Sequence, residues 1–156
     1  QKGRRTLYTY FKNKSAIYLA VIEKEISLLQ EKLQTVLDKN VPPDQKIIEY
    51  LFVHLEAAKE ALTRNGSLRA DFFKDIYEVE HARQRVDLWE TDRLTEIIQQ
   101  GINDGIFNCK DARLTATILF YSLKGMEQSY FRDRVSKMVD SNREEIVRVL
   151  FTGLCK

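Results

Sequence analysis

Apolar residues recur along this chain at spacings of three and four positions, which is the period of an α-helix with one buried face. No run alternates apolar and polar residues in the way that predicts a β-strand. Turn residues separate the periodic segments, as at Val41-Pro42-Pro43 and Asn65-Gly66. The pattern predicts an all-α fold class, a helical bundle of about seven helices, at about 4–11, 13–38, 44–64, 67–77, 86–105, 111–131 and 141–154.

Two segments stand out from this regular pattern. The helix at 44–64 is apolar around most of its circumference, with one polar stripe formed by Glu49, Glu56 and Glu60. We expect such a helix at the centre of the bundle. The charged stretch 78–85 interrupts the apolar pattern, and we expect a break in the helical structure there, at a position that the pattern does not define.

The composition argues against several classes of protein. Six Gly and two Pro in 156 residues leave few places for tight turns, which disfavours a hairpin-rich β fold. The two cysteines, Cys109 and Cys155, lie far apart and predict neither a disulfide framework nor a zinc site. No stretch approaches the roughly 18 apolar residues of a membrane span, and no secretory signal is visible. We expect a cytoplasmic protein with no membrane partner, no cofactor and no metal.

Positive charge is concentrated at one end of the chain. Residues 1–24 hold six cations against Glu23, a net charge of +5, whereas the whole chain carries only +2. A basic end on a mildly acidic body suggests contact with a polyanion, although a solvated basic tail would produce the same count. Because the chain starts with Gln1 and a basic segment follows at once, we expect further elements upstream.

The segment 4–11 has the residue types of a helix that enters the major groove of DNA. Arg4 and Arg5 lie at its N-terminal end, where long donors reach guanine O6 and N7. Lys14 lies at the start of the following helix, where free N–H groups favour a phosphate. Hydroxyl groups for phosphate oxygens are supplied by Thr6, Tyr8, Thr9 and Tyr10.

The same segment also has an interpretation without DNA. Leu7 and Phe11 stand four residues apart and are expected to anchor this helix in a core, and one of Tyr8 and Tyr10 can be buried with them. A short basic helix is a common surface feature. Residue chemistry alone therefore leaves both interpretations open.

The run from Gly3 to Lys14, Gly-Arg-Arg-Thr-Leu-Tyr-Thr-Tyr-Phe-Lys-Asn-Lys, resembles the most diagnostic segment of TetR-type transcriptional regulators. A dozen positions agree in type and spacing, and the resemblance continues into the apolar start of the next helix. More loosely, Gly101-x-x-x-Gly105-Ile-Phe107 followed by Asp111 resembles the penultimate region of that family. The resemblance implies a nine-helix fold of which this chain holds the last seven helices.

The resemblance also implies two domains with different functions along the chain. Residues 1–24 would form the C-terminal part of a helix-turn-helix DNA-binding domain, and residues 25–156 a helical ligand-binding and dimerisation domain. Thr6, Tyr8 and Lys14 match phosphate-contacting positions. At the family's positions that reach bases or the adjacent backbone, this chain has Arg4, Arg5, Thr9 and Tyr10. Many members have Ser/Lys-Gly or Pro in place of Arg4-Arg5, so a base preference cannot be transferred.

The implied function is that of a homodimeric, sequence-specific DNA-binding regulator, a repressor released by a small-molecule effector. In the family, the last two long helices of each subunit form a four-helix bundle. The last helix shows an apolar band that we expect at this dimer interface, formed by Ile146, Val147, Leu150, Phe151 and Leu154. The alternative is a helical small-molecule-binding or protein-interaction module with no DNA role.

Motifs for catalysis or metal binding do not assemble in this sequence, so we expect no enzyme. Glu78-x-x-His81 has the spacing of a di-iron ligand pair, but such a site needs a second pair. The other histidine, His54, has Leu51 in the position where the glutamate would stand. A solvated charged stretch is the better interpretation of residues 78–81.

An effector site is expected inside the helical body. His54 lies opposite the glutamate stripe of its helix and should point inward, either as a satisfied core residue or as a polar contact in a ligand cavity. Aromatic side chains suit an apolar pocket with few polar groups. The expected ligand-binding residues are Tyr50, His54, Phe72, Tyr77, Trp89 and Tyr121.

Overall fold

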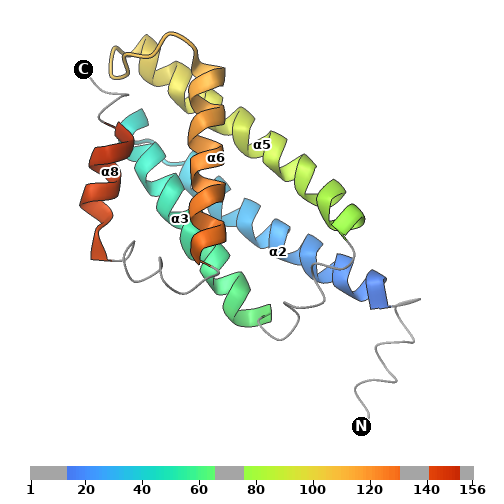
Figure 1. Ribbon diagram of the computed structural model, residues 1–156. Coiled ribbons are helices and arrows are strands. Elements are labelled where there is room, and N and C mark those ends of the chain that lie inside the picture. Colours follow the sequence, from blue (N-terminus) through green and yellow to red (C-terminus); the bar gives the residue numbers. More distant parts are fainter. Residues whose placement is uncertain (1–13, 66–75, 131–140, 152–156) are drawn as a thin grey trace.

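The computed structural model describes residues 14–65, 76–130 and 141–151, and these residues are helical throughout apart from short connections. No strand occurs within these ranges, which confirms the all-α prediction. Five helices are described: α2 (Lys14–Leu37), α3 (Pro43–Asn65), α5 (Ile76–Asn103), α6 (Ala112–Tyr130) and α8 (Arg143–Phe151) (Figure 1). The predicted helix at 4–11 and most of the one at 67–77 lie outside the described residues.

The helix boundaries follow from local hydrogen bonding. Pro43 is the first residue of α3, a position where its missing N–H has no helical partner to lose. Lys46 reaches back from α3 and donates from Nζ to the carbonyl of Leu37 at 2.8 Å, at the C-terminal end of α2. Asp111 caps α6, since its Oδ1 accepts from the backbone N–H of Leu114 at 2.9 Å. Both residues lie at helix starts, in agreement with the helices predicted at 44–64 and 111–131.

The break expected within 78–85 is absent, and that prediction is wrong. α5 runs without interruption from Ile76 to Asn103. The stretch contains neither Gly nor Pro, and its Glu, Arg and Gln residues have high helix propensity. The charged residues of this stretch interrupt the apolar pattern, but they do not end the helix.

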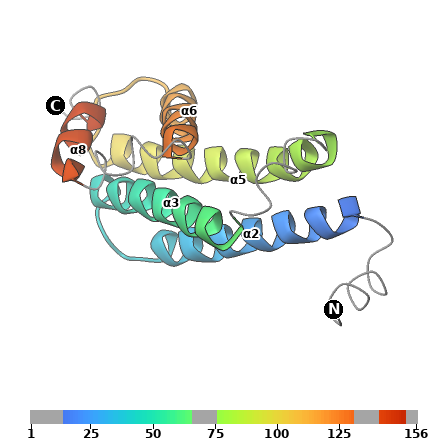
Figure 2. The ribbon, with the colours of Figure 1, turned by 60° about the horizontal axis from the view of Figure 1, so that its bottom comes forward.

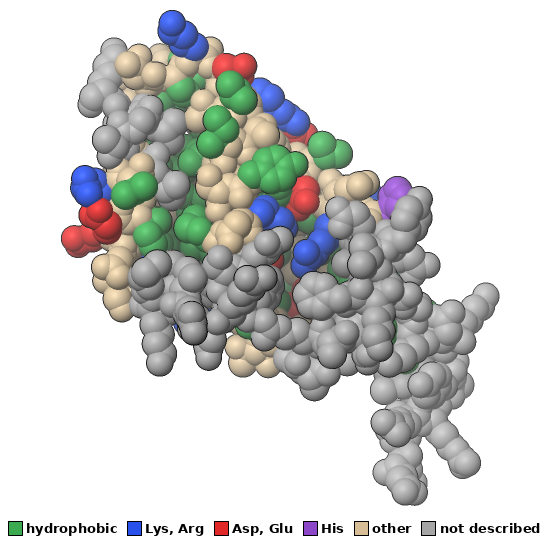
Figure 3. Space-filling view, in the orientation of Figure 1, with side chains coloured by type: hydrophobic (Ala, Val, Ile, Leu, Met, Phe, Trp, Pro, Cys, Tyr) green, Lys and Arg blue, Asp and Glu red, His purple; other side chains and the backbone are tan. Residues whose placement is uncertain are grey.

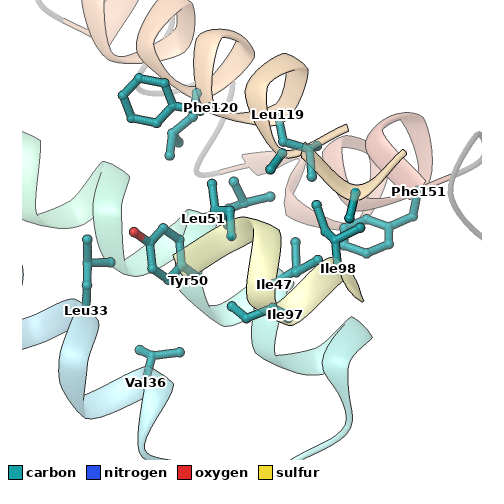
Figure 4. Close-up of a cluster of buried hydrophobic side chains, with 14 of the residues drawn as sticks. Leu33, Val36, Ile47, Tyr50, Leu51, Ile97, Ile98, Leu119, Phe120 and Phe151 are labelled. Carbon is teal, nitrogen blue, oxygen red and sulfur yellow. The ribbon is translucent and has the colours of Figure 1, made fainter. Parts of the chain in front are cut away.

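The helices pack around one apolar core. α5 contacts α2, α3 and α6, and α3 also packs against α2 and α6 (Figures 1 and 2). Side chains from all of these helices meet in the centre, as Figure 4 shows for Leu33 of α2, Ile47 of α3, Ile98 of α5 and Phe120 of α6. α3 contributes buried residues from Pro43 to Ala57, the part of the helix that lies in the centre, whereas residues 58–65 are partly or fully exposed.

α8 closes one end of this core. Phe151 is buried, and its ring centroid lies 6.4 Å from that of Phe107 in the connection between α5 and α6. Ile146 and Val147 also pack against the core cluster. The inward face of α8 is therefore used within the same chain.

In the helices that the structure describes, we find none that combines the length and the apolar character needed to cross a membrane.

The turn after α5 depends on two glycines. Gly105 has a φ of 70° and ends the helix in the left-handed conformation. The carbonyl of Gly101 accepts from the N–H groups of Ile106 at 2.8 Å and Phe107 at 3.0 Å. A Cβ at Gly101 would overlap the ring of Phe107, so this glycine is needed for the ring to lie across the helix.

We therefore expect Gly101→Ala to lower the free energy of unfolding by about 1–3 kcal/mol, because the methyl group would displace the Phe107 ring. Urea denaturation would measure the change. Gly125→Ala is the matched control, since no atom lies within 4 Å of a Cβ built there, and it should gain roughly 0.5–1 kcal/mol. Equal stability of the two variants would show that the contact with Phe107 is not tight.

Candidate functional site

The expected DNA-contacting residues fall at the edge of the described structure. Lys14 is the first described residue of α2. The other six expected contacts lie outside the described residues: Arg4, Arg5, Thr6, Tyr8, Thr9 and Tyr10. Their role in DNA binding stays a prediction.

A buried polar cluster lies between α3 and α5. His54 Nδ1 lies 2.8 Å from Glu90 Oε2, and the hydroxyl of Tyr50 donates to the same oxygen at 3.0 Å. The exposed fraction is 1% for His54 and 0% for Glu90, and Tyr50 is also fully buried. A buried carboxylate is tolerated only when charge and hydrogen bonds compensate its loss of water, and His54 and Tyr50 supply both.

α6 extends this cluster toward the surface. Glu127 Oε2 lies 3.6 Å from His54 Nε2, and its side chain is only 12% exposed. Lys124 Nζ lies 3.3 Å from the same Glu127 oxygen and 3.4 Å from Asp87 Oδ1 on α5. We call the whole set the polar cluster: Tyr50, His54, Asp87, Glu90, Lys124 and Glu127.

The cluster holds His54 in its charged form. Burial disfavours the imidazolium, but the carboxylates of Glu90 and Glu127 outweigh burial and raise the pKa of His54 to about 9. Burial also opposes ionisation of Glu127, yet His54 and Lys124 lower the pKa of Glu127 to about 2. His54 is therefore an imidazolium between two carboxylates at neutral pH.

Burial is the main influence on the pKa values of two other groups in the cluster. Loss of solvent, reinforced by the charge of Glu90, raises the pKa of the Tyr50 hydroxyl, which stays a hydrogen-bond donor. Burial likewise raises the pKa of Asp87, against the opposing effect of Lys124.

Tyr50 and His54 are predicted to point inward, and both are buried. Glu90 and Glu127 are not among the predicted site residues, although each carries a signal in the sequence. Glu90 falls on the same helical stripe as Val86 and Leu94, and Glu127 on that of Phe120 and Leu123. An acidic residue inside an apolar stripe predicts a buried charge that needs a partner.

The remaining expected pocket residues do not join this cluster. Tyr121 was expected to face the interior, but it is 69% exposed on the outer face of α6. Its neighbours Phe120 and Leu123 face the core, which turns position 121 outward at helical spacing. Trp89 is half-buried against the core, Phe72 lies outside the described residues, and Tyr77 lies in α5 without a described side chain.

A separate pocket of about 240 Å³ opens on the surface between α2, α3 and α5. Its cations are already engaged, since Lys46 donates to the carbonyl of Leu37 and Arg93 pairs with Glu96 at 2.7 Å. Within the described ranges, no group of three or more His, Cys, Asp or Glu is arranged to hold a metal ion.

The outer face of α6 carries an exposed apolar stripe. Leu114, Ile118 and Tyr121 are 57%, 59% and 69% exposed, at the i, i+4, i+7 spacing of one helix face. Apolar side chains are visible along α6 in the space-filling view (Figure 3). Val149 is exposed on the outer side of α8. We call Leu114, Ile118 and Tyr121 the outer stripe.

The residues expected at a dimer interface have mixed positions. Phe151 is buried against Phe107 in its own subunit, and Ile146 and Val147 are partly buried against the core. Leu150 lies in α8 without a described side chain, and Leu154 is outside the described residues. The apolar band of the last helix is wide because one side of it packs against the core of the same chain.

α3 is also tied to α2 by charged side chains at its C-terminal end. Arg64 donates to Glu25 of α2 at 2.7 Å and to Glu60 at 3.1 Å, and Lys32 of α2 lies 2.6 Å from Glu60. The hydrogen bond from Arg64 outweighs burial and holds the pKa of Glu25 below its ordinary value. We call Glu25, Lys32, Glu60 and Arg64 the interhelix clamp.

Several solved structures of transcriptional regulators share the fold of this chain. A transcriptional regulator from Cytophaga hutchinsonii superposes with a TM-score of 0.78 at 20% identity, covering 99% of this chain and 82% of that one. The MbdR regulator of Azoarcus has a TM-score of 0.73 at 17% identity, covering 97% and 82%. The TetR family regulator PfmR of Thermus thermophilus has a TM-score of 0.69 at 16% identity, covering 99% and 84%.

The chain has the fold of TetR-type regulators. No family model matches the sequence, and no curated protein matches it. The three solved structures share the fold at 16–20% identity, so the chemistry of the site is argued from this chain's own residues.

The polar cluster generates a pH prediction. The pKa of His54 is about 9 in the folded protein and near 6.5 when unfolded, so its contribution to stability is complete below pH 6.5 and is lost as pH rises through about 9. That loss should amount to roughly 3 kcal/mol at most. Urea unfolding across this window would measure it, and NMR of the imidazole would follow the proton directly.

The control for this prediction is the double variant His54→Gln with Glu90→Gln. It keeps polar side chains of similar size but removes both buried charges, so its stability should change little over the same pH window. An imidazole of His54 that titrates near its ordinary value in the wild-type protein would contradict the ion-pair assignment.

Proposed function

We propose that this protein is a sequence-specific DNA-binding transcriptional regulator, a repressor released by a small-molecule effector and acting as a homodimer. The observation that carries the proposal is the combination of a TetR-type regulator fold with the segment Thr6-Leu-Tyr-Thr-Tyr-Phe11 directly ahead of α2. All three solved structures compared above are regulators rather than enzymes, and the proposal assigns no catalytic step.

In this proposal the first residues contact DNA in two ways. Thr6, Tyr8 and Lys14 contact phosphates and position the protein, whereas Arg4 and Arg5 read base edges. The adjacent side chains Thr9 and Tyr10 reach bases or the neighbouring backbone. Lys14 is the first described residue of α2, and the free N–H groups at the start of that helix are proposed to lie beside the same phosphate.

The dimer is proposed to form through the outer stripe. Its three large apolar side chains lie on one exposed face of α6, and Val149 is exposed on α8. Burial of such a stripe against its symmetry mate would form an isologous interface, as most homodimers do.

The effector signal is proposed to travel along α3. This helix carries Tyr50 and His54 in the polar cluster, and its C-terminal end is fastened to α2 by the interhelix clamp. α2 in turn follows the recognition segment directly. A ligand that shifts α3 would move α2 and change the separation of the two recognition helices, which must match half-sites about 34–36 Å apart.

Lys14→Ala in the full-length protein should weaken binding to all operators alike and lower the slope of log affinity against log salt by about 1. Tyr8→Phe should likewise weaken binding without changing preference. Lys110→Ala, at the far end of the molecule after α5, is the matched control and should leave the slope unchanged. An unchanged slope for Lys14→Ala would remove this residue from the phosphate contacts.

Arg4→Ala and Arg5→Ala should behave differently from the phosphate variants. At least one should relax preference at a single base pair by about 1–3 kcal/mol, measured by binding-site selection followed by affinities for single-base variants. Uniform loss across all sequences would show that both arginines act only through charge.

Ile118→Glu should convert the dimer to monomer without unfolding it, because this side chain is 59% exposed in one subunit. Sedimentation and circular dichroism would measure assembly and folding. Leu88→Glu, at an equally exposed apolar position on α5, is the matched control and should stay dimeric. Wild-type protein that sediments as a monomer at micromolar concentration would contradict the dimer.

A further inference from the structure

The polar cluster carries an excess of negative charge on its α5–α6 side. Its carboxylates are Asp87, Glu90 and Glu127, and its cations are His54 and Lys124, which leaves a net charge of −1 with His54 protonated. Arg83, on the exposed side of α5, lowers the pKa values of Asp87 and Glu127 only through its charge. An interior with unbalanced negative charge favours a further cation.

The structure already holds an ammonium group at this place. Lys124 Nζ lies between Asp87 Oδ1 at 3.4 Å and Glu127 Oε2 at 3.3 Å, and 5.7 Å from the centre of the Phe120 ring. Two carboxylates and an aromatic ring are the surroundings that bind an organic ammonium ion. Lys124 reaches them on a long side chain that can rotate to solvent.

Two carboxylate oxygens of the cluster are buried without a hydrogen-bond partner in the described part of the chain: Asp87 Oδ1, which lies 3.4 Å from Lys124 Nζ, and Glu90 Oε1. Among the residues that the structure describes, Glu90 Oε1 is buried and has no hydrogen-bond partner, whereas Oε2 of the same carboxylate has two. Glu90 is 0% exposed, so leaving this oxygen unmatched costs stability. A donor brought by another molecule would satisfy it.

We propose that the polar cluster is a binding site for an organic cation, an ammonium or amidinium group carried on an apolar body. The cationic group takes the place of Lys124 Nζ between Asp87 and Glu127, and its remaining donors reach toward Glu90 Oε1. This inference rests on the proposed function, because it names the chemical class of the effector. An anionic effector would add a fourth negative charge to three carboxylates, which the cluster disfavours.

The route of approach follows the gradient of burial. Asp87 and Lys124 are partly exposed, Glu127 is nearly buried, and Glu90 and His54 are fully buried. A cation entering between α5 and α6 therefore meets Asp87 first and Glu90 last. Since His54 lies on α3, any shift of Glu90 or Glu127 toward the ligand loosens the contacts that hold α3.

The test uses three probes with one apolar body and different head groups: 4-phenylbutylamine, 4-phenylbutan-1-ol and 4-phenylbutanoate. Binding to the full-length protein would be measured by calorimetry, and chemical shifts of His54 and Lys124 would locate the site. The amine should bind at least about tenfold more tightly than the alcohol, and the carboxylate more weakly still.

Two variants separate a specific site from general charge attraction. Asp87→Asn should weaken the amine about tenfold, because it removes one of the two carboxylates that flank the ammonium group and leaves the buried pair of His54 and Glu90 intact. Lys124→Met should tighten the amine severalfold, because it vacates the position between Asp87 and Glu127 and is not expected to unfold a partly exposed site. Glu56→Gln, which alters an exposed carboxylate elsewhere on α3, should leave the affinities for the amine and the alcohol unchanged.

The outcomes distinguish this inference from the proposed function. Binding of all three probes with equal affinity, or of none of them at millimolar concentration, overturns the cation site. Tighter binding of the carboxylate or the alcohol, with release of operator DNA, overturns the cation site but supports a ligand-responsive regulator. Binding of the amine at the cluster without any change in DNA affinity supports the site and contradicts its role as the effector site.

Discussion

The buried pair between His54 and Glu90 is the constraint on which the rest of the body depends. It places a full positive and a full negative charge where no solvent reaches, and the two charges are acceptable only together. Tyr50 and Glu127 are held in position by the same pair, so one interaction joins α3, α5 and α6. Around it the core is otherwise apolar, and the register of these three helices is fixed by a polar match rather than by shape alone.

This pair also bears on the signalling role proposed for α3. The middle of the helix is bound through charges that exclude water, and its C-terminal end is bound to α2 through charges that water can reach. Exposed ion pairs such as Arg64 with Glu25 contribute little to stability individually. A helix held firmly in its middle and weakly at its C-terminal end can move at that end at small cost, as the proposed transmission to α2 requires.

The fold was largely predictable, because it follows from local periodicity and from capping residues. Pro43 and Asp111 marked helix starts through their own backbone chemistry, which needs no tertiary information. The break expected within 78–85 is absent, because a run of charged residues indicates exposure to solvent and not the end of a helix. Assignment of α8 to a dimer interface was incomplete for a different reason: the sequence shows that Phe151 is apolar, but not that Phe107 lies opposite it.

The site was predictable only in part. His54 was recognised as inward-facing, yet its partners Glu90 and Glu127 lie 36 and 73 positions away, and pairing over such separations is a property of packing. Tyr121 was misplaced because aromatic character suits a pocket and an exposed stripe equally well. Buried charge is the one feature that could have been sought directly, as acidic residues on apolar helical stripes.

The contact between Phe151 and Phe107 has a consequence for how the chain matures. During synthesis from the N-terminus, α2, α3, α5 and α6 emerge before the residue that closes their core at the α5–α6 turn. Until α8 is made, Phe107 has no aromatic cover and presents apolar surface to the cell. A nascent chain that stalled ahead of α8 would therefore be recognised by chaperones as unfinished, although most of its helices could already be paired.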